Sequence, residues 1–407
     1  WTDSMDHLPG TGKPLAVSGI RLGAAAAGIK RQDRDDLLII EADEGATMAA
    51  VFTQNAFCAA PVRVAREHLG AAPRWLLINS GNANAGTGDQ GLQDARTTCR
   101  ALADLVAADQ RQVLPFSTGV IGEFLPVAKI ESALPAALAA LDESGWERAA
   151  RAIMTTDTRP KMASRTCQIG DESITVTGIA KGAGMIHPNM ATMLAFLATD
   201  ARVNPSDLQA VLARETDKTF NCITIDGDTS TNDACVLLAS GAAMGSPLDP
   251  ATAHFAHFEQ AVFDVCAELA EAIVRDGEGA TKLMRILVQQ ARDAAEARMV
   301  AKTIALSPLV KTAFFASDPN WGRILAAVGR AGCEQLDIAG VSIWLGDVQI
   351  VHHGGRAESY TEEAGAAVMA RDEILVRVEL GRGAAEETVL TCDFSYDYVR
   401  INAEYRT

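Results

Sequence analysis

The order of strand-like and helix-like segments constrains the fold of this chain more than any other feature of its sequence. Runs typical of strands lie at 17–26, 36–41, 49–53, 74–79 and 113–117, and apolar residues recur with helical spacing over 90–107. Strands and helices do not alternate strictly, as they would in a doubly wound parallel sheet. The pattern instead predicts an α/β fold in which β-sheets are covered by helices.

The second half of the chain continues this mixture. Strands are predicted at 173–178, 193–199, 282–289, 312–316, 341–345, 348–352, 374–380 and 388–393, and helices at 126–141, 145–154, 206–216, 251–275, 320–328 and 361–371. A loop is predicted over 179–190. With 407 residues the chain is long enough for two lobes.

The charge balance argues against nucleic-acid and membrane-surface partners. The chain carries 36 basic and 52 acidic side chains, a net charge of −16, which repels phosphate backbones and anionic lipids. Its eight cysteines are scattered without a C-x-x-C pair or a neighbouring histidine. This distribution predicts free thiols in a reducing compartment and no metal site.

Targeting and cofactor signals are also missing from the sequence. No segment reaches the roughly 18 apolar residues of a membrane span, and residues 1–13 lack the apolar core of a signal peptide. We therefore expect a cytoplasmic protein. The chain has no P-loop and no G-x-G-x-x-G between a strand and a helix, so the usual nucleotide-binding templates fail. It also has no G-x-S-x-G, so the usual hydrolase template fails as well.

The segment from Gly178 to Phe196 is the most unusual part of the sequence. A glycine-rich loop with one lysine, Lys181, leads through a Pro-Asn turn to Ala191-Thr192 and an apolar run. The plain interpretation, which the local pattern alone favours, is a turn before a buried strand. The chemical interpretation is a scissile Ala191–Thr192 bond, opened by an N→O acyl shift, with Lys181 adding positive charge nearby. The freed Thr192 α-amine, with a pKa near ~8, would then serve as base for its own hydroxyl.

Three further segments allow either a structural or a functional interpretation. The glycines of 117–122 permit backbone N–H groups to converge as an oxyanion hole requires, but they also suit a turn between a strand and a helix. The polar cluster 155–161 either caps a helix or binds substrate. The segment 275–282 is either a helix C-cap with glycine or a place where Glu278 binds a substrate ammonium group.

Taken together, these segments resemble the ornithine acetyltransferase / glutamate N-acetyltransferase family, often described as the arginine-biosynthesis bifunctional protein. The resemblance runs from Val17 to Thr407. Its motifs are 79–85 (NSGNANA), 155–158 (TTDT), 181–193 (KGAGMIHPNMATM), 226–233 (DGDTSTND), 276–282 (DGEGATK) and 317–323 (SDPNWGR). Because six motifs match in order, the chemical interpretation of Thr192 outweighs the plain one.

The resemblance implies how the chain is divided and folded. It implies self-cleavage between Ala191 and Thr192. An α chain, 1–191, would carry the oxyanion hole, and a β chain, 192–407, would begin with the nucleophile and carry the C-terminal substrate-binding part. Two copies of each chain would assemble together. The implied fold is a layered α/β sandwich of two β-sheets with flanking helices, of the self-cleaving N-terminal-threonine type.

The resemblance also assigns roles to individual residues. Thr192 would be the nucleophile, and Thr118 and Gly119 would stabilise the oxyanion. The substrate-binding positions would be Thr155, Lys181, Thr192, Glu278, Asn402 and Thr407.

The expected activity is ping-pong acetyl transfer from N-acetylornithine to glutamate, through an acetyl-Thr192 ester, in arginine biosynthesis. No cofactor is expected, and the sequence leaves acetyl-CoA open as a second acetyl donor. One alternative is an amidase or aminopeptidase that uses the same threonine. Another is a non-enzymatic binding or regulatory protein, against which the complete set of site residues argues.

Overall fold

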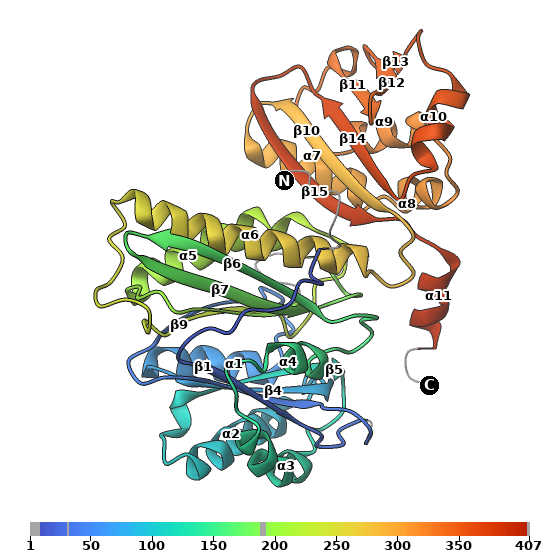
Figure 1. The fold of residues 1–407 in the computed structure, drawn as a ribbon. Helices are drawn as coiled ribbons and strands as arrows, with labels where there is room; N and C mark the ends of the chain where they lie inside the picture. Colours follow the sequence, from blue (N-terminus) through green and yellow to red (C-terminus); the bar gives the residue numbers. More distant parts are fainter. Residues whose placement is uncertain (1–8, 31, 188–192, 405–407) are drawn as a thin grey trace. The chain divides into compact units, whose positions relative to one another are not determined.

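The computed structural model describes residues 9–30, 32–187 and 193–404, which form two compact units (Figure 1). Unit 1 comprises the described residues of Trp1–Gly182, Pro188–Asn221 and Thr229–Ile273. Unit 2 comprises Ala183–His187, Cys222–Asp228 and the described residues of Val274–Thr407. The predicted chains 1–191 and 192–407 are defined by a cleavage site, whereas the two units are defined by how compactly the chain folds. The division into two chains therefore stays a prediction.

The first sheet of unit 1 has four strands in the order β1-β2-β4-β5. Their bounds are β1 Ile20–Ala25, β2 Leu37–Ala42, β4 Trp75–Asn82 and β5 Val113–Val120. Strand β2 is antiparallel to both of its neighbours, β1 and β4, and β5 lies parallel to β4. All residues of β2 are buried, which explains its continuous apolar run, because both faces of the sheet are covered.

The second sheet of unit 1 has five strands in the order β3-β9-β8-β7-β6. Their bounds are β3 Thr47–Phe52, β6 Lys161–Ile169, β7 Glu172–Lys181, β8 Leu194–Thr199 and β9 Ala234–Ala239. Strands β8 and β9 are parallel, whereas the other neighbours are antiparallel. The central strand β8 is buried along its whole length.

The two sheets of unit 1 pack face to face over one apolar core. Phe116 of the first sheet and Phe196 of the second meet edge to face, with ring centroids 5.3 Å apart. Helices α2 and α3 cover the outer face of the first sheet, and α5 and α6 cover that of the second (Figure 1). The helices of this unit are α1 Ala60–His68, α2 Gly88–Leu105, α3 Val127–Ala139, α4 Trp146–Ala152, α5 Pro205–Lys218 and α6 Ala253–Arg275. The predicted sandwich of two sheets with flanking helices is confirmed for this unit.

Unit 2 adds a third sheet, which the sequence did not predict as a separate layer. Its order is β13-β12-β11-β14-β10-β15. The strands are β10 Leu283–Ala291, β11 Ser342–Leu345, β12 Val348–His352, β13 Gly355–Arg356, β14 Glu373–Glu379 and β15 Ala385–Cys392. The helices are α7 Ala294–Ala305, α8 Pro308–Phe315, α9 Trp321–Gly329, α10 Glu362–Met369 and α11 Tyr396–Ala403. Alternate residues of β10 and β14 are buried against α7 to α10, so helices cover one face of this sheet.

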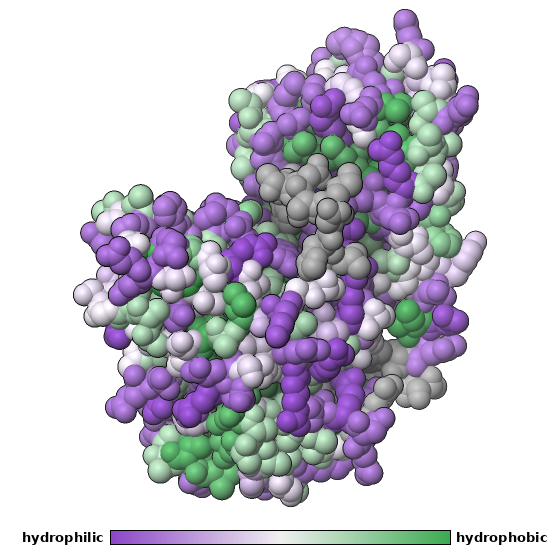
Figure 2. Space-filling view, in the orientation of Figure 1, coloured by the Kyte–Doolittle hydropathy of each residue, from purple (hydrophilic) through white to green (hydrophobic). Residues whose placement is uncertain are grey.

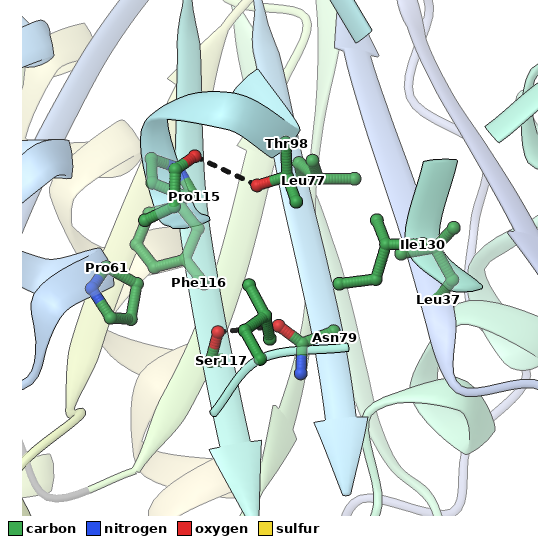
Figure 3. Close-up of a pocket in the computed structure, with 11 residues that line it drawn as sticks. Leu37, Pro61, Leu77, Asn79, Thr98, Pro115, Phe116, Ser117 and Ile130 are labelled. Carbon is green, nitrogen blue, oxygen red and sulfur yellow. Dashed lines mark hydrogen bonds between the residues drawn. The ribbon is translucent and has the colours of Figure 1, made fainter. Parts of the chain in front are cut away.

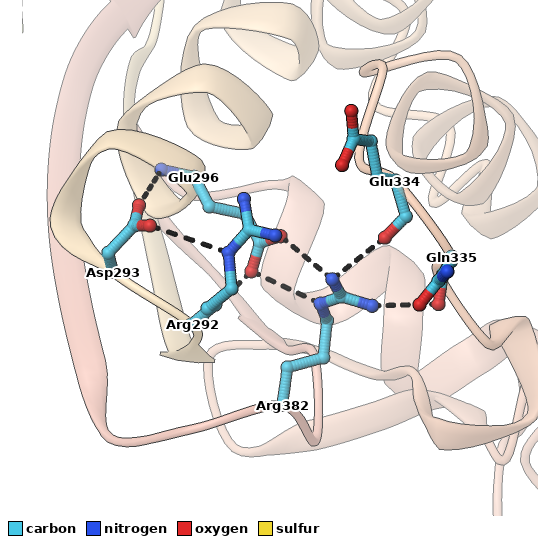
Figure 4. Close-up of polar contacts among 6 residues, drawn as sticks. All are labelled: Arg292, Asp293, Glu296, Glu334, Gln335 and Arg382. Carbon is cyan, nitrogen blue, oxygen red and sulfur yellow. Dashed lines mark hydrogen bonds and ion pairs between the residues drawn. The ribbon is translucent and has the colours of Figure 1, made fainter.

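A polar network fixes the start of α7 in unit 2 (Figure 4). Asp293 caps the helix by accepting a hydrogen bond from the Glu296 amide at 2.8 Å. The Glu296 carboxylate accepts hydrogen bonds from the Arg292 amide and from Arg382, which precedes β15. Arg382 also donates to the carbonyl of Gln335 at 2.8 Å. These bonds join three segments that lie far apart in the sequence.

Two of the sequence predictions are wrong at the level of single elements. The run 312–316 is predicted as a strand but belongs to helix α8, where Ser307 caps the helix and Pro308 occupies its first turn. The predicted loop over 179–190 begins too early, because β7 continues to Lys181. Pairing of Ile179, Ala180 and Lys181 with β8 keeps this end of β7 extended.

The visible face of the protein is mainly hydrophilic, in keeping with the net charge of −16 (Figure 2). Among the described helices, none combines the length and the apolar character needed to cross a bilayer. All eight cysteines are free thiols.

Candidate active site

Thr118 and Gly119, the predicted oxyanion-stabilising residues, lie near the end of β5 in unit 1. Gly119 has a φ of +134°, and a β carbon built there would lie 2.3 Å from the carbonyl carbon of Gly81 on β4. Only glycine tolerates both the conformation and the close approach. The position therefore presents backbone and no side chain, as an oxyanion hole requires.

Two asparagines hold this strand end in place. Asn82, at the end of β4, donates to the carbonyls of Glu123 and Phe124 at 3.2 and 3.0 Å. Asn232 donates to the carbonyl of Ser117 at 2.9 Å. Both side chains are buried, and satisfied buried amides fix the backbone that they bind. The sequence marked both asparagines as parts of motifs but gave no sign of their positioning role.

Lys181 contacts the predicted oxyanion site. It is the last residue of β7, and its Nζ donates a hydrogen bond to Thr118 Oγ1 at 3.2 Å. Its backbone pairs with Leu194, the first residue of β8. The structure thus brings together two predicted site residues that are far apart in the sequence.

Asp157 links Thr155 to Lys181, although the sequence did not predict it as a site residue. Its carboxylate accepts hydrogen bonds from the Thr155 amide at 3.0 Å, the Gly182 amide at 2.7 Å and Lys161 Nζ at 2.7 Å. Burial would raise the pKa of Asp157, but the charges of Lys161 and Lys181 and the hydrogen bonds hold it well below its usual range. The ionised carboxylate therefore fixes Thr155 beside the end of β7.

Glu278 and Asn402 meet in unit 2. Asn402 Nδ2 donates to Glu278 Oε2 at 2.8 Å, and the Glu278 side chain is largely buried. The Glu278 amide donates to the carbonyl of Ala183 at 2.8 Å. Gly184 lies directly against the carboxylate, because a β carbon there would be 2.5 Å from Glu278 Oε2. Two predicted substrate-binding residues therefore share one hydrogen-bonded group.

Asp226 organises the same part of unit 2, a role that the sequence did not predict. Its carboxylate accepts hydrogen bonds from the amides of Met185 and Ile186 at 2.7 and 2.9 Å. It also accepts one from the Tyr398 hydroxyl of α11 at 3.3 Å. Burial and the neighbouring Asp226 charge raise the pKa of Tyr398, which therefore stays a hydrogen-bond donor. Asp226 thus joins the segment that carries Gly184 to the helix that carries Asn402.

Three predicted site residues lie outside the described residues: Ala191, Thr192 and Thr407. The chain is described again from Met193, which is buried and whose carbonyl accepts a hydrogen bond from the Ala234 amide at 3.0 Å. The roles assigned to these three residues stay predictions.

A small cavity in unit 1 does not serve as a substrate pocket (Figure 3). It lies between the first sheet and the helices that cover it, lined mostly by apolar side chains such as Leu37 and Ile130. Its volume of about 10 Å³ has room for at most one water molecule. Ser117 and Asn79 hydrogen-bond to each other at its polar end. Within the described ranges, no three His, Cys, Asp or Glu side chains are grouped as a metal site would need.

Comparison with known proteins finds similarity along nearly the whole chain. Residues 21–407 match the ArgJ family. The arginine biosynthesis bifunctional protein ArgJ of Methylococcus capsulatus is 67% identical over 391 residues, which cover 96% of each chain. The protein of the same name from Pseudomonas fluorescens is 56% identical over 392 residues, covering 96% of this chain and 97% of that protein.

Similarity also extends to solved structures. One is the ornithine acetyltransferase of Mycobacterium tuberculosis in complex with ornithine, which is 33% identical. The match covers 45% of this chain and 97% of that chain, with a TM-score of 0.39.

Proposed function

The chain belongs to the ArgJ family, and from this premise we propose that it is an acetyltransferase of arginine biosynthesis, moving acetyl from N-acetylornithine to glutamate. The observation in unit 1 that supports this proposal is the hydrogen bond from Lys181 to Thr118 beside Gly119. Family membership favours the transferase over the amidase or aminopeptidase alternative. It also supports the predicted cytoplasmic location, since the pathway uses soluble amino acids.

The proposed activation is self-cleavage of the Ala191–Thr192 bond. Thr192 Oγ attacks the Ala191 carbonyl carbon, the C–N bond breaks, and water hydrolyses the resulting ester. The new α-amine of Thr192, with an unperturbed pKa near ~8, is unprotonated often enough to accept the hydroxyl proton. Nucleophile and base then belong to one residue.

The proposed transfer proceeds in two acyl steps. Thr192 Oγ attacks the acetyl carbonyl of N-acetylornithine while its α-amine takes the proton, and that proton then passes to the departing ornithine amine. The tetrahedral oxyanion is held at Thr118 and Gly119, where one donor is worth about 3–4 kcal/mol. The glutamate amine next attacks the acetyl ester and regenerates Thr192. Water must be kept from this ester, or transfer becomes hydrolysis.

The proposed recognition of the substrate divides among the remaining site residues. Glu278, held by Asn402, would bind the ornithine side-chain ammonium through a charge-assisted hydrogen bond. Lys181 and Thr155 would bind polar groups of the substrate near Thr118. Thr407 and Thr192 complete the proposed set. Acetyl-CoA as a second acetyl donor is tested by supplying it with glutamate in place of N-acetylornithine.

Replacement of the nucleophile tests the proposed function. We expect T192A to remain one 43.0 kDa chain without transfer activity, whereas the wild type yields two fragments, one starting at Thr192. Intact mass and denaturing electrophoresis measure cleavage, and chromatography separates N-acetylglutamate from acetate. T199A, which changes a buried threonine at the other end of β8, is the matched control and should be cleaved. A cleaved or active T192A protein would contradict the proposal, and acetate as the product with glutamate present would favour the hydrolase.

A further inference from the structure

Lys311 is enclosed in the interior of unit 2. It lies in helix α8, and the residue is only 1% exposed. Among the described residues its ammonium group contacts a hydroxyl, a carbonyl and an aromatic ring, but no carboxylate. Burial lowers the pKa of Lys311, because the charged form loses its hydration. Lysine is almost never fully buried without an ionic partner, so this position needs an explanation.

The Lys311 side chain binds the end of strand β15. Its Nζ donates hydrogen bonds to Thr391 Oγ1 at 2.7 Å and to the carbonyl of Cys392. The Nζ atom also lies 4.6 Å from the centre of the Phe394 ring, within the range of a cation–π interaction. The Phe394 amide donates to the Lys311 carbonyl at 3.2 Å. Lys311 therefore holds the segment between β15 and α11 through its side chain and through its backbone.

The contacts continue from Phe394 into helix α11. The Phe394 and Tyr398 rings are stacked, with centroids 4.8 Å apart and planes inclined by 23°. Asn402 Nδ2 donates to the Tyr398 carbonyl at 3.0 Å and to Glu278 Oε2 at 2.8 Å. Because no residue of α11 is buried, the helix depends on such contacts for its position. A continuous series of contacts thus joins a buried lysine to the carboxylate of the candidate site.

We propose that Lys311 is a positioning residue for substrate recognition, fixing the start of α11 so that Asn402 holds the Glu278 carboxylate ready for the ornithine side-chain ammonium. The inference rests on the proposed function. Lys311 does not touch the substrate itself, but acts through Phe394 and Tyr398. Its hydrogen bonds are directional, whereas an apolar side chain would fill the same volume and leave the position of Phe394 less well defined.

Stability alone does not account for a lysine at this position. Enclosing an ammonium group without a counterion costs free energy, which an apolar side chain of similar length does not. Replacement of Lys311 by methionine should therefore change the melting temperature little. A lysine that serves recognition and a lysine that serves folding consequently predict different properties for K311M.

Two acetyl donors separate these roles. N-acetylornithine carries the side-chain ammonium, whereas N-acetylnorvaline has the same carbon chain without it. We expect K311M to raise the KM for N-acetylornithine about tenfold at an unchanged kcat, because a misplaced Glu278 weakens ground state and transition state equally. The kcat/KM for N-acetylnorvaline should equal that of the wild type. Steady-state formation of N-acetylglutamate, at saturating glutamate, measures both.

V310A is the matched control on the same helix. Val310 directly precedes Lys311 and is buried in the apolar core of unit 2. V310A should lower the melting temperature and leave the ratio of kcat/KM between the two donors unchanged. K311M should do the reverse, changing the ratio with little effect on the melting temperature.

The same assays contain the results that would overturn the inference. An unchanged KM for N-acetylornithine in K311M would do so. Equal losses of kcat/KM for both donors would also do so, since they would show a general effect on the fold. If the wild type transfers no acetyl from N-acetylornithine at all, the proposed function fails instead.

A second variant, F394L, applies if thermal unfolding shows that K311M folds poorly. Phe394 is only partly buried, and leucine keeps its apolar character while removing the ring that contacts both Lys311 and Tyr398. F394L should show the same selective rise in the KM for N-acetylornithine. Wild-type kinetics with both donors in F394L would mean that Lys311 does not act through this ring, and the inference would be wrong.

Discussion

At the scale of single residues, the buried ion pair of Asp157 and Lys161 connects stability with the proposed site. Their Oδ1 and Nζ atoms are 2.7 Å apart, and both side chains are almost fully enclosed. Such a pair costs desolvation energy and becomes strongly destabilising when one partner is removed. Because the same carboxylate binds the amides of Thr155 and Gly182, stability and site geometry depend on one group.

We expect D157N to lower the free energy of unfolding by about 3–5 kcal/mol, since it removes the carboxylate charge that pairs with the buried Lys161 ammonium. Urea unfolding followed by circular dichroism measures the change. The control D35N breaks the exposed pair of Asp35 with Arg148 and should cost about 0–1 kcal/mol. If D157N and D35N lowered the free energy of unfolding by the same amount, burial of the Asp157–Lys161 pair would not matter and the prediction would be wrong.

The same pair predicts a pH dependence. The folded state lowers the pKa of Asp157, so its contribution to stability is complete above the unfolded-state value of about 4 and is lost as the pH falls further. The difference in unfolding free energy between wild type and D157N should therefore shrink only below about pH 4.

The sequence predicted site residues that belong to a recognisable motif. It missed residues whose role depends on what surrounds them once they are buried. The structure brings Thr118 and Lys181 together, and likewise Glu278 and Asn402. Asp157 was visible only as a polar residue after a helix, which is equally typical of a cap. Its ionised state depends on Lys161 and on chain segments whose proximity no local pattern reveals.

At the scale of elements, helix α11 carries a proposed substrate-binding residue but contributes nothing to the core. None of its residues is buried, and Tyr396 and Val399 are largely exposed. Ser395 caps the helix through the Asp397 amide and also donates to the carbonyl of Gly279, next to Glu278. A few contacts near its start therefore determine where Asn402 lies.

We expect S395A to raise the KM for N-acetylornithine about fivefold, because loss of a cap costs about 1 kcal/mol and loosens α11. The melting temperature should hardly change, since the helix lies outside the core. Steady-state kinetics and thermal unfolding measure the two effects. S307A is the matched control: it removes the cap of α8, whose Phe314 is buried in the core of unit 2, and should lower the melting temperature without changing KM. If S395A lowered the melting temperature and left KM unchanged, while S307A raised KM, this view of α11 would be refuted.

Element predictions followed periodicity, and they failed where another signal competed. The strand predicted at 36–41 is β2, and the helix predicted at 251–275 is α6. Both predictions were right because the apolar residues in these segments follow one clear pattern. The run 312–316 contains residues that favour strands, yet the cap at Ser307 and the buried i, i+3, i+4 spacing made it a helix. Strand β6 was missed because three consecutive polar residues, Ser164 to Thr166, interrupt the alternation that marks a strand.

At the scale of the whole molecule, the proposed cleavage would divide a sheet between two chains. Strands β6 and β7 precede residue 191 and β8 and β9 follow it, yet all four belong to one sheet. Strands β7 and β8 pair from Val176–Thr199 to Lys181–Leu194. Backbone pairing and the shared core, rather than the peptide bond, would then hold the fragments together.

We expect the cleaved fragments of 191 and 216 residues to co-elute in size-exclusion chromatography and to separate only in denaturant. Light scattering on the same peak gives the number of copies, and the predicted assembly of two α and two β chains requires twice 43.0 kDa. The T192A protein is the uncut control. Fragments that separate under native conditions would show that the sheet does not hold them.

The sequence predicted the sandwich of unit 1 but not the three-sheet total of the described part. Local periodicity identifies strands, whereas the assignment of strands to sheets depends on pairs such as β3 with β9, which are remote in the sequence. The resemblance supplied two sheets, and the C-terminal strands form a third one in unit 2.

The contact between Gly119 and the backbone of Gly81 has a consequence for engineering. With only 2.3 Å between a built β carbon and the neighbouring carbonyl carbon, this part of β5 has no spare volume in which a new side chain could be introduced. A library aimed at bulkier acyl donors should therefore leave both glycines unvaried. Substitutions should instead be introduced at the exposed positions of α11, where a new side chain meets solvent rather than backbone.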